Sequence, residues 1–213
     1  MKILLTGFEP FGEESINPSY EAIKKLKDSK KNLKIIEIPT SFYKSIEKLK
    51  IVINKFNPDV VICVGQAGGR YNISIERVAI NVNDARIEDN LGNQPIDEKV
   101  VESGPNAYFT NLPIKSMVNR LLKSNIPAEV SNSAGTYVCN HLMYGLMDII
   151  EDSKKNIKGG FIHVPFTHDQ VINKKNQPSL ALETITEAFE LIIDFLNNEN
   201  LEKDLDLAFG KEN

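Results

Sequence analysis

The feature of this sequence that most constrains its fold is the run DVVICVG at residues 59–65. Five consecutive positions in it, 60–64, are apolar. A strand with one solvated face alternates apolar and polar residues, whereas a continuous apolar run of this length is typical of a strand covered on both faces in a parallel sheet. Parallel neighbours need long crossover connections, usually helices, so the run predicts an α/β protein.

The rest of the chain alternates short apolar runs with segments of helical periodicity. The further predicted strands are residues 2–6, 32–38, 128–133 and 159–165. The predicted helices are residues 19–30, 43–56, 113–124 and 139–150, and a last one that starts after Pro178. This order predicts an α/β sandwich with a mostly parallel, twisted central sheet. We expect one domain over residues 1–213, with a polar tail at about 198–213 that frays.

The segment NISIERVAINVNDARI at residues 72–87 changes its side-chain phase. Apolar residues occupy odd positions up to Ile75 and even positions from Val78 onward, so the change falls at Glu76 and Arg77. A strand changes phase only through a bulge or an interruption, and bulges often lie beside active sites. A simple strand break or hairpin is the favoured interpretation here.

Composition excludes several classes of function. The chain has 213 residues, a net charge of −4 and no basic excess for nucleic acid or an anionic membrane. No run approaches the roughly 18 apolar residues of a membrane span. The start, MKILLTGFEPFG, is too short and too interrupted for a signal peptide. Two cysteines outside any CxxC pair favour a reducing, cytoplasmic location.

Polar chemistry collects after the predicted strands. Ligands of open α/β sheets bind beyond the carboxyl ends of the strands. Four features follow strands in this chain: GFEPFG at residues 7–12, GQAGGR at residues 65–70, Cys139 and His163. We therefore expect all four at one edge of the sheet. The glycine-rich GQAGGR segment resembles a phosphate cradle, but no helical pattern follows it directly.

Cys139 is the candidate nucleophile. It stands where the small-residue stretch SNSAGTYV ends and a helical pattern begins. The positive end of a helix dipole favours a thiolate at such a position. Cys63, inside the apolar run, is expected to be an inert core residue. The structural alternative for Cys139 is an ordinary small, half-buried side chain.

His163, at the end of a predicted strand, is the candidate base. His141 is two residues after Cys139, which points the two side chains to nearly opposite sides of a helix, and His168 lies in a predicted loop. An acidic residue would orient the imidazole, and Glu76 is the first candidate. Its rivals are Asp84, Glu88 and Asp89.

No motif for a metal or cofactor stands out. The chain lacks GxSxG, HExxH, GxGxxG and GxxxxGK[ST] patterns. His163, His168 and Asp169 match no strong metal-ligand spacing, so we expect neither a metal nor a cofactor. Two other classes of function stay open at this point, which are a non-enzymatic binding module with a structural cysteine and a cysteine hydrolase for another amide.

At these residues the chain resembles the pyroglutamyl peptidase I family, also called pyrrolidone-carboxylate peptidases. The resemblance follows family order over nearly the whole chain. Its segments are TGFEPFG at 6–12, INPS at 16–19, VGQAGGR at 64–70, ERVAIN at 76–81, ARIEDNLGNQP at 85–95, AYFTNLPIK at 107–115, SNSAGTYVCNHLMYGLM at 131–147 and GGFIHVP at 159–165. One departure is PFTHDQ at 165–170, where the family has a more apolar PYIPEQ-like segment.

The resemblance implies a cysteine peptidase that removes N-terminal pyroglutamyl residues from peptides through a thioester acyl-enzyme. The family's catalytic triad falls on Glu76, Cys139 and His163. The resemblance further implies a three-layer α/β/α sandwich, a cytoplasmic location, no metal and frequent assembly into homotetramers.

Substrate-binding residues are expected both from the residue types in the sequence and from the family resemblance. The rings of Phe8 and Phe11 in GFEPFG can sandwich a flat lactam, although plain core packing is the alternative. The resemblance adds polar contacts, and backbone N–H groups near one arginine that are expected to stabilise the oxyanion. The residues that it adds are Asn17, Thr40, the backbone at Gln66, and Arg86.

Overall fold

The computed structural model describes residues 1–26, 32–153, 155–199 and 201–210. Its centre is a six-stranded sheet in the order β2-β1-β3-β8-β4-β7. The strands are β1 (Ile3–Phe8), β2 (Leu33–Ile38), β3 (Val60–Gln66), β4 (Ile73–Glu76), β7 (Ala128–Ser131) and β8 (Lys158–Val164).

The sheet is mostly parallel, as the sequence predicts. Strands β2, β1, β3 and β8 all run in one direction. Strand β4 pairs with β8 in the antiparallel sense, and β7 pairs with β4 in the parallel sense, so these last two strands are reversed. The carboxyl ends of four neighbouring strands therefore share one edge of the sheet, and the two reversed strands enter from that side.

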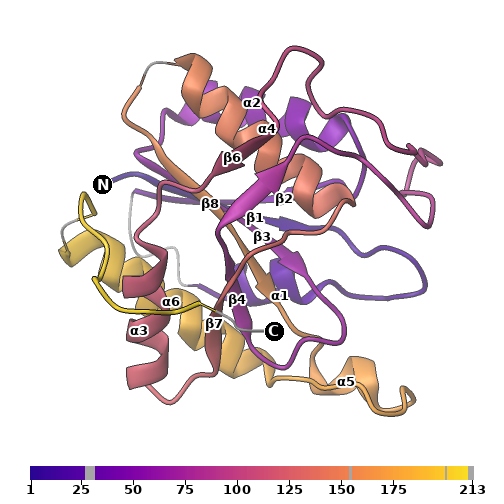
Figure 1. Ribbon diagram of the computed structural model, residues 1–213. Coiled ribbons are helices and arrows are strands. Elements are labelled where there is room, and N and C mark those ends of the chain that lie inside the picture. Colours follow the sequence, from indigo (N-terminus) through magenta and orange to yellow (C-terminus); the bar gives the residue numbers. More distant parts are fainter. Residues whose placement is uncertain (27–31, 154, 200, 211–213) are drawn as a thin grey trace.

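Helices cover both faces of the sheet and make the expected three-layer α/β/α sandwich (Figure 1). Helices α1 (Pro18–Ile23), α3 (Ile114–Lys123) and α6 (Leu182–Asn198) pack on one face, and α2 (Lys44–Phe56) and α4 (Val138–Ser153) pack on the other. In the described part of the chain, no helix is long and apolar enough to cross a bilayer.

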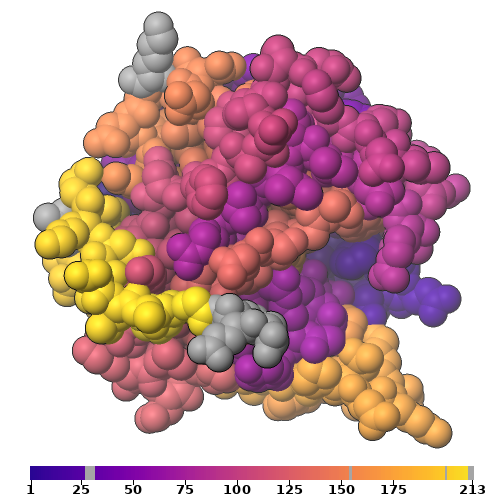
Figure 2. Space-filling model, viewed as in Figure 1, coloured from indigo at the N-terminus to yellow at the C-terminus, as the bar shows by residue number. Residues whose placement is uncertain are grey.

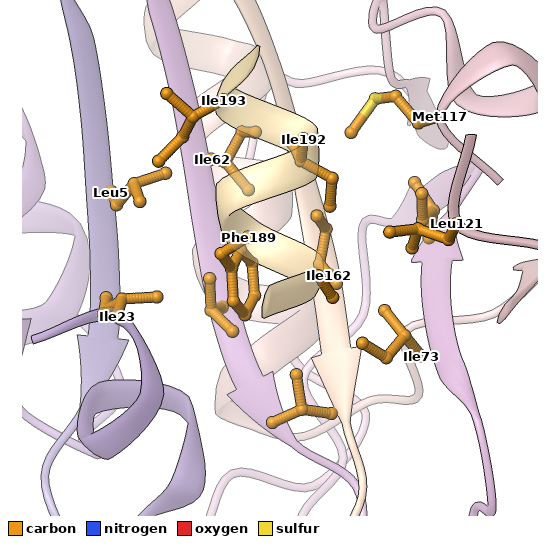
Figure 3. Close-up of a cluster of buried hydrophobic side chains, with 14 of the residues drawn as sticks. Leu5, Ile23, Ile62, Ile73, Met117, Leu121, Ile162, Phe189, Ile192 and Ile193 are labelled. Atoms are coloured by element: carbon orange, nitrogen blue, oxygen red, sulfur yellow. The ribbon is translucent and has the colours of Figure 1, made fainter. Parts of the chain in front are cut away.

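Strand β3 has every residue buried, which is why its sequence lacks alternation. Its even-numbered side chains belong to the core under α6, where Phe189 and Ile192 face Ile62 and Ile162 of the sheet (Figure 3). Its odd-numbered side chains, among them Cys63, belong to the core under α2 and α4. Two separate hydrophobic cores thus hold one sheet between them.

The phase change after Ile75 is a strand break, as predicted. Strand β4 ends at Glu76, and β5 (Val78–Ile80) belongs to a separate two-stranded sheet with β6 (Ala107–Phe109). Because of the break, Ile73 and Ile75 of β4 pack in the core under α6, whereas Ala79 of β5 packs in the core under α2 and α4.

Three local predictions differ from the structure. The three-residue strand β6 and the single-turn helix α5 (His168–Val171) were not expected, because elements this short carry too few residues for a periodic pattern. Helix α1 is shorter than the predicted 19–30. Residues 27–30 of that prediction lie outside the described residues.

The polar tail is anchored as far as it is described, contrary to the predicted fraying. The Asp204 carboxylate accepts hydrogen bonds from the backbone N–H groups of Lys115 and Ser116 at 3.0 and 2.8 Å. Pro113 at the start of α3 provides no side-chain cap, so these first-turn donors are free to bind another acceptor. The tail supplies that acceptor in the manner of a helix cap.

We predict that Ile192→Ala lowers the free energy of unfolding by about 2–5 kcal/mol, because Ile192 is fully buried against the sheet. The matched control is Ile172→Ala, since Ile172 is 75% exposed and the same truncation there should change stability by less than about 0.5 kcal/mol. Urea unfolding followed by circular dichroism measures both. Equal losses for the two variants would contradict the described packing of α6.

Candidate active site

A small pocket opens at the edge where β1, β3 and β8 end. It has a volume of about 150 Å³. Its walls contain both Cys139 and His163, and Phe8 and Gln66 in its lining are the last residues of β1 and β3. The lining residues are Phe8, Phe11, Asn17, Thr40, Gln66, Ala134, Tyr137, Val138, Cys139 and His163. All four features expected at this edge are thus brought together here, with GFEPFG represented by Phe8 and Phe11 and GQAGGR by Gln66.

Cys139 reaches the pocket by a route that differs from the predicted one. The preceding strand β7 is reversed, so its carboxyl end does not point to the shared edge. The loop at residues 132–137 carries the chain back, and α4 begins at Val138. Cys139 therefore lies in the first turn of α4, as predicted, where backbone N–H groups lack partners within the helix.

Gly65 allows the sulfur of Cys139 to approach the sheet. A Cβ atom at this position would lie 2.8 Å from Cys139 Sγ and 2.7 Å from the ring of Phe161, which is closer than carbon atoms tolerate. Gly65 is also the register partner of His163 on the neighbouring strand. The absence of a side chain on β3 thus makes room for the sulfur beside the strand that carries the imidazole.

His163 is oriented by Glu76 across two antiparallel strands. Ser74 is directly opposite His163, so Glu76 is its diagonal neighbour on the same face of the sheet. Diagonal positions are about 7–8 Å apart, a span that long side chains bridge. The gap between His163 Nδ1 and Glu76 Oε1 is 2.7 Å, and both side chains are buried. With Nδ1 bonded to the carboxylate, Nε2 is left for the pocket.

Arg70 completes the surroundings of Glu76. Its Nη1 donates to Glu76 Oε1 at 2.7 Å, and its Nη2 donates to the carbonyl of Ser133 at 3.1 Å. The arginine therefore joins the buried carboxylate to the loop that leads to Cys139. Sequence reasoning missed this residue, although its place at the end of GQAGGR, directly after a central strand, was a usable signal.

Burial and charge decide the protonation states of the three groups. Burial raises the pKa of Glu76, but the hydrogen bond from His163 and the charge of Arg70 outweigh it and lower the pKa. Burial lowers the pKa of His163, and Glu76 opposes this only in part. Burial, followed by the charge of Glu76, raises the pKa of Cys139 to about 12.

The free site therefore holds a neutral thiol and a neutral imidazole beside an ionised carboxylate. This corrects the prediction of a stable thiolate at Cys139. The favourable helix terminus is present, but desolvation of the sulfur outweighs it. Cys63 is fully buried, and its pKa is likewise raised to about 12, mainly by burial, as expected for an inert core thiol.

The rival acidic residues have other roles or positions. Asp89 is buried, but its carboxylate accepts hydrogen bonds from the backbone of Phe42, Leu91 and Asn93. Asp84 and Glu88 are exposed and do not line the small pocket. None of the three is bonded to His163.

The other two histidines are also engaged elsewhere. His141 Nε2 accepts the backbone N–H of Tyr43 at 2.8 Å, and its Nδ1 bonds Asn83 at 3.0 Å. Burial lowers the pKa of His141 to about 4, so it is a neutral structural residue at ordinary pH. His168 is exposed on α5 and bonds Ser179. In the described ranges, no group of three or more His, Cys, Asp or Glu side chains is arranged to hold a metal ion.

Five of the six residues expected to bind substrate line the pocket, but in different ways. Phe8 is buried and packs on Phe161, whereas Phe11 is half-buried and packs on Tyr137 with ring centroids 6.2 Å apart. Tyr137 was not predicted, although it stands two residues before Cys139.

The polar side chains that line the pocket differ in how many hydrogen-bonding groups remain available to a substrate. Asn17 caps α1 through Ser19 and donates to the carbonyl of Glu9, so its amide is used within the fold. Thr40 donates its hydroxyl to the same carbonyl, which leaves the oxygen able to accept. Gln66 accepts at Oε1 from Gln170 at 2.9 Å, so its side-chain NH₂ remains a donor.

Arg86 does not line the small pocket. It lies in a larger groove of about 740 Å³ beside it. The two spaces share Phe11 and Tyr137 as common walls. Of the other predicted substrate contacts, only Phe11 lines the same groove as Arg86.

The geometry of a cysteine, a histidine and a carboxylate around a small pocket defines a cysteine hydrolase, and comparison with known proteins identifies its family. The model of the family described as pyroglutamyl peptidase matches residues 1–199. The chain belongs to this family of cysteine peptidases.

Individual relatives agree. The chain is 63% identical over 188 residues to the pyrrolidone-carboxylate peptidase of Thermosipho melanesiensis, covering 87% of this chain and 93% of that protein. It is 58% identical over 195 residues to that of Clostridium botulinum, covering 91% and 92%. Its structure is similar to pyroglutamyl peptidase I of Bacillus amyloliquefaciens, with a TM-score of 0.91, 49% identity and coverage of 96% and 99%.

We predict that Arg70→Gln raises the pKa of His163, because the charge of Arg70 lowers that pKa in the native protein. The pH titration of the imidazole protons by NMR measures this, and with three histidines in the chain the signals are assignable by single substitutions. Arg77→Gln is the matched control, since the Arg77 guanidinium bonds Asn132 in the same loop, whereas the ion pairs of the Glu76 carboxylate are with Arg70 and His163. An unchanged titration of His163 in Arg70→Gln would contradict the electrostatic role of this arginine.

Proposed function

We propose that this chain hydrolyses the amide bond after an N-terminal pyroglutamyl residue, with Cys139 as nucleophile, His163 as general acid and base, and Glu76 as the residue that orients the imidazole. The observation that carries the proposal is that Cys139 and His163 open onto one small pocket while Glu76 holds the far nitrogen of the ring. Membership of the pyroglutamyl peptidase family gives the class of reaction.

The reaction begins with a neutral thiol. As the sulfur of Cys139 attacks the pyroglutamyl carbonyl carbon, its proton moves to Nε2 of His163, and the carbonyl oxygen becomes negative. Backbone N–H groups in the first turn of α4 stabilise that oxygen. When the intermediate collapses, the C–N bond breaks and the leaving amine takes the proton from His163.

The second half of the reaction returns the enzyme to its starting state. A thioester now joins Cys139 to the pyroglutamyl group. Water attacks this thioester while His163 again accepts a proton, and the thiolate that leaves recovers it from the imidazolium. Pyroglutamate is released. Throughout, the Glu76 carboxylate stabilises the positive charge that His163 carries transiently.

The neutral resting pair has a physical consequence. A stable thiolate would be reactive toward any electrophile, whereas a thiol with its pKa raised to about 12 becomes nucleophilic only as His163 removes its proton. Because Arg70 balances the charge of Glu76, the developing thiolate and imidazolium meet little net negative charge. Deprotonation is therefore coupled to attack on a bound substrate.

The chemistry of the pocket explains the preference for a lactam. An ordinary N-terminus is a charged ammonium, which is costly to bury without a partner. No carboxylate occurs among the residues that line the pocket in the described chain. Pyroglutamate is cyclic and neutral, so it avoids this cost. The free NH₂ of Gln66 is suited to the lactam carbonyl, and the aromatic faces of Phe11 and Tyr137 are suited to the ring.

The test is hydrolysis of fluorogenic aminomethylcoumarin amides. We expect release of fluorophore from the pyroglutamyl amide and none from the prolyl or glutamyl amides, which carry a charged amine. Cys139→Ser should lower kcat/KM by about 10³-fold or more, while Cys63→Ala stays active because Cys63 is buried in the core and does not line the pocket.

Alkylation separates an enzyme from a binding module with a structural cysteine. Iodoacetamide should modify Cys139 before Cys63 and abolish turnover, with a rate that increases with pH because the thiolate is the reactive form. Near-normal turnover of Cys139→Ser, or full activity after modification of Cys139, would remove this cysteine from the mechanism.

We also propose that the chain is a single domain of residues 1–213 that acts in the cytoplasm as a homotetramer. The two free cysteines fit a reducing compartment, and the motif resemblance supports the assembly. Light scattering should give four times the chain mass of 23.9 kDa. A monomeric mass at micromolar concentration would overturn the proposed assembly but not the chemistry.

A further inference from the structure

The small pocket has no space for the peptide that follows the pyroglutamyl residue. Its volume of about 150 Å³ is occupied by one ring, and the scissile bond must lie beside Cys139. A groove of about 740 Å³ adjoins it and shares Phe11 and Tyr137 with the pocket. The remaining walls of the groove are Asp84, Arg86, Ile87 and Thr136.

The groove is close to the reacting sulfur. Thr136 is three residues before Cys139, so their Cα atoms are at most about 11 Å apart. A leaving peptide therefore reaches the groove with its first or second residue. In the space-filling view, the surface is recessed on the right, where the indigo N-terminal segment lies behind its neighbours next to the loop after β5 (Figure 2).

Hydrogen bonds fix the groove to the segment that carries the nucleophile. The backbone N–H of Asp84 donates to the carbonyl of Thr136 at 3.0 Å, and the Thr136 hydroxyl donates to the carbonyl of Asp84 at 2.8 Å. The Tyr137 hydroxyl donates to the carbonyl of Glu88 at 3.0 Å. The loop at residues 84–88 is thus a preformed wall, which lowers the entropic cost of binding a peptide against it.

The charged groups of the groove are unoccupied. Asp84 and Arg86 are both exposed, and across the described ranges neither side chain has a hydrogen-bond or ion-pair partner. A guanidinium presents a planar set of donors that matches a carboxylate in bidentate geometry. A pyroglutamyl dipeptide carries its C-terminal carboxylate on the residue directly after the scissile bond, which places the carboxylate within about one residue of the groove.

We infer that this groove is the subsite for the leaving peptide, and that the Arg86 side chain binds the C-terminal carboxylate of short pyroglutamyl peptides. The inference rests on the proposed function. It assigns the Arg86 side chain a contact with the leaving group, which is separate from the backbone oxyanion donor that the family resemblance suggested near this residue. A free carboxylate next to the scissile bond therefore increases kcat/KM over the corresponding amide.

The experiment compares pyroglutamyl-alanine with pyroglutamyl-alanine amide as substrates, with the released alanine or alanine amide measured by chromatography. We expect kcat/KM to be about fivefold higher for the acid than for the amide, the range of a partly exposed ion pair. The ratio should fall toward one in Arg86→Gln and be partly retained in Arg86→Lys. It should also decrease with added salt, as expected of an exposed pair.

Asp84→Asn is the matched control within the same groove. This change removes the negative charge of Asp84 from the groove. The ratio of kcat/KM for the acid to kcat/KM for the amide should therefore stay the same or increase. Using a ratio makes the result independent of any general loss of activity or folding in a variant. A ratio near one in the native enzyme, or an unchanged ratio in Arg86→Gln, would overturn the inference.

Hydrolysis of the pyroglutamyl coumarin amide distinguishes a failure of the proposed subsite from a failure of the proposed function. That substrate has no carboxylate in its leaving group. If it is hydrolysed while the dipeptide ratio does not depend on Arg86, the subsite is wrong and the proposed function stands. If it is not hydrolysed by the native protein, the proposed function itself fails.

Discussion

The buried carboxylate of Glu76 is the constraint on which the rest of the site depends. It has no exposed surface, and an unpaired buried charge costs several kcal/mol. His163 and Arg70 meet its Oε1 oxygen at 2.7 Å each. Because Arg70 also binds the carbonyl of Ser133, the same charge holds the imidazole in one orientation and fixes the loop before the candidate nucleophile.

The reversal of two strands makes this arrangement possible. In the antiparallel pairing of β4 with β8, Glu76 becomes the diagonal neighbour of His163 on the face covered by α4. Because β7 runs parallel to β4, it ends at the edge of the sheet opposite the pocket. Residues 132–137 therefore carry the chain back to the pocket before α4 begins. Gly65 leaves the space into which the returning chain places its sulfur.

Much of the fold was predictable because its signals are local. The apolar run of β3, the break after Glu76 and the helical pattern from Cys139 each depend on side chains within a few residues of one another. Short elements such as β6 were missed because three residues are too few to show a periodic pattern of apolar side chains. The anchored tail was missed because Asp204 caps a helix about 90 positions earlier in the chain, and no local pattern indicates such a contact.

The sequence by itself determined the α/β layering, the place of Cys139 at a helix start and the few polar residues available to a reaction, because periodicity and residue type are properties of short segments. Only the tertiary structure decided that the thiol is neutral at rest, that Arg70 joins the site, and that Arg86 faces a separate groove. These depend on desolvation and on distances between strands and loops, which arise when remote segments pack together.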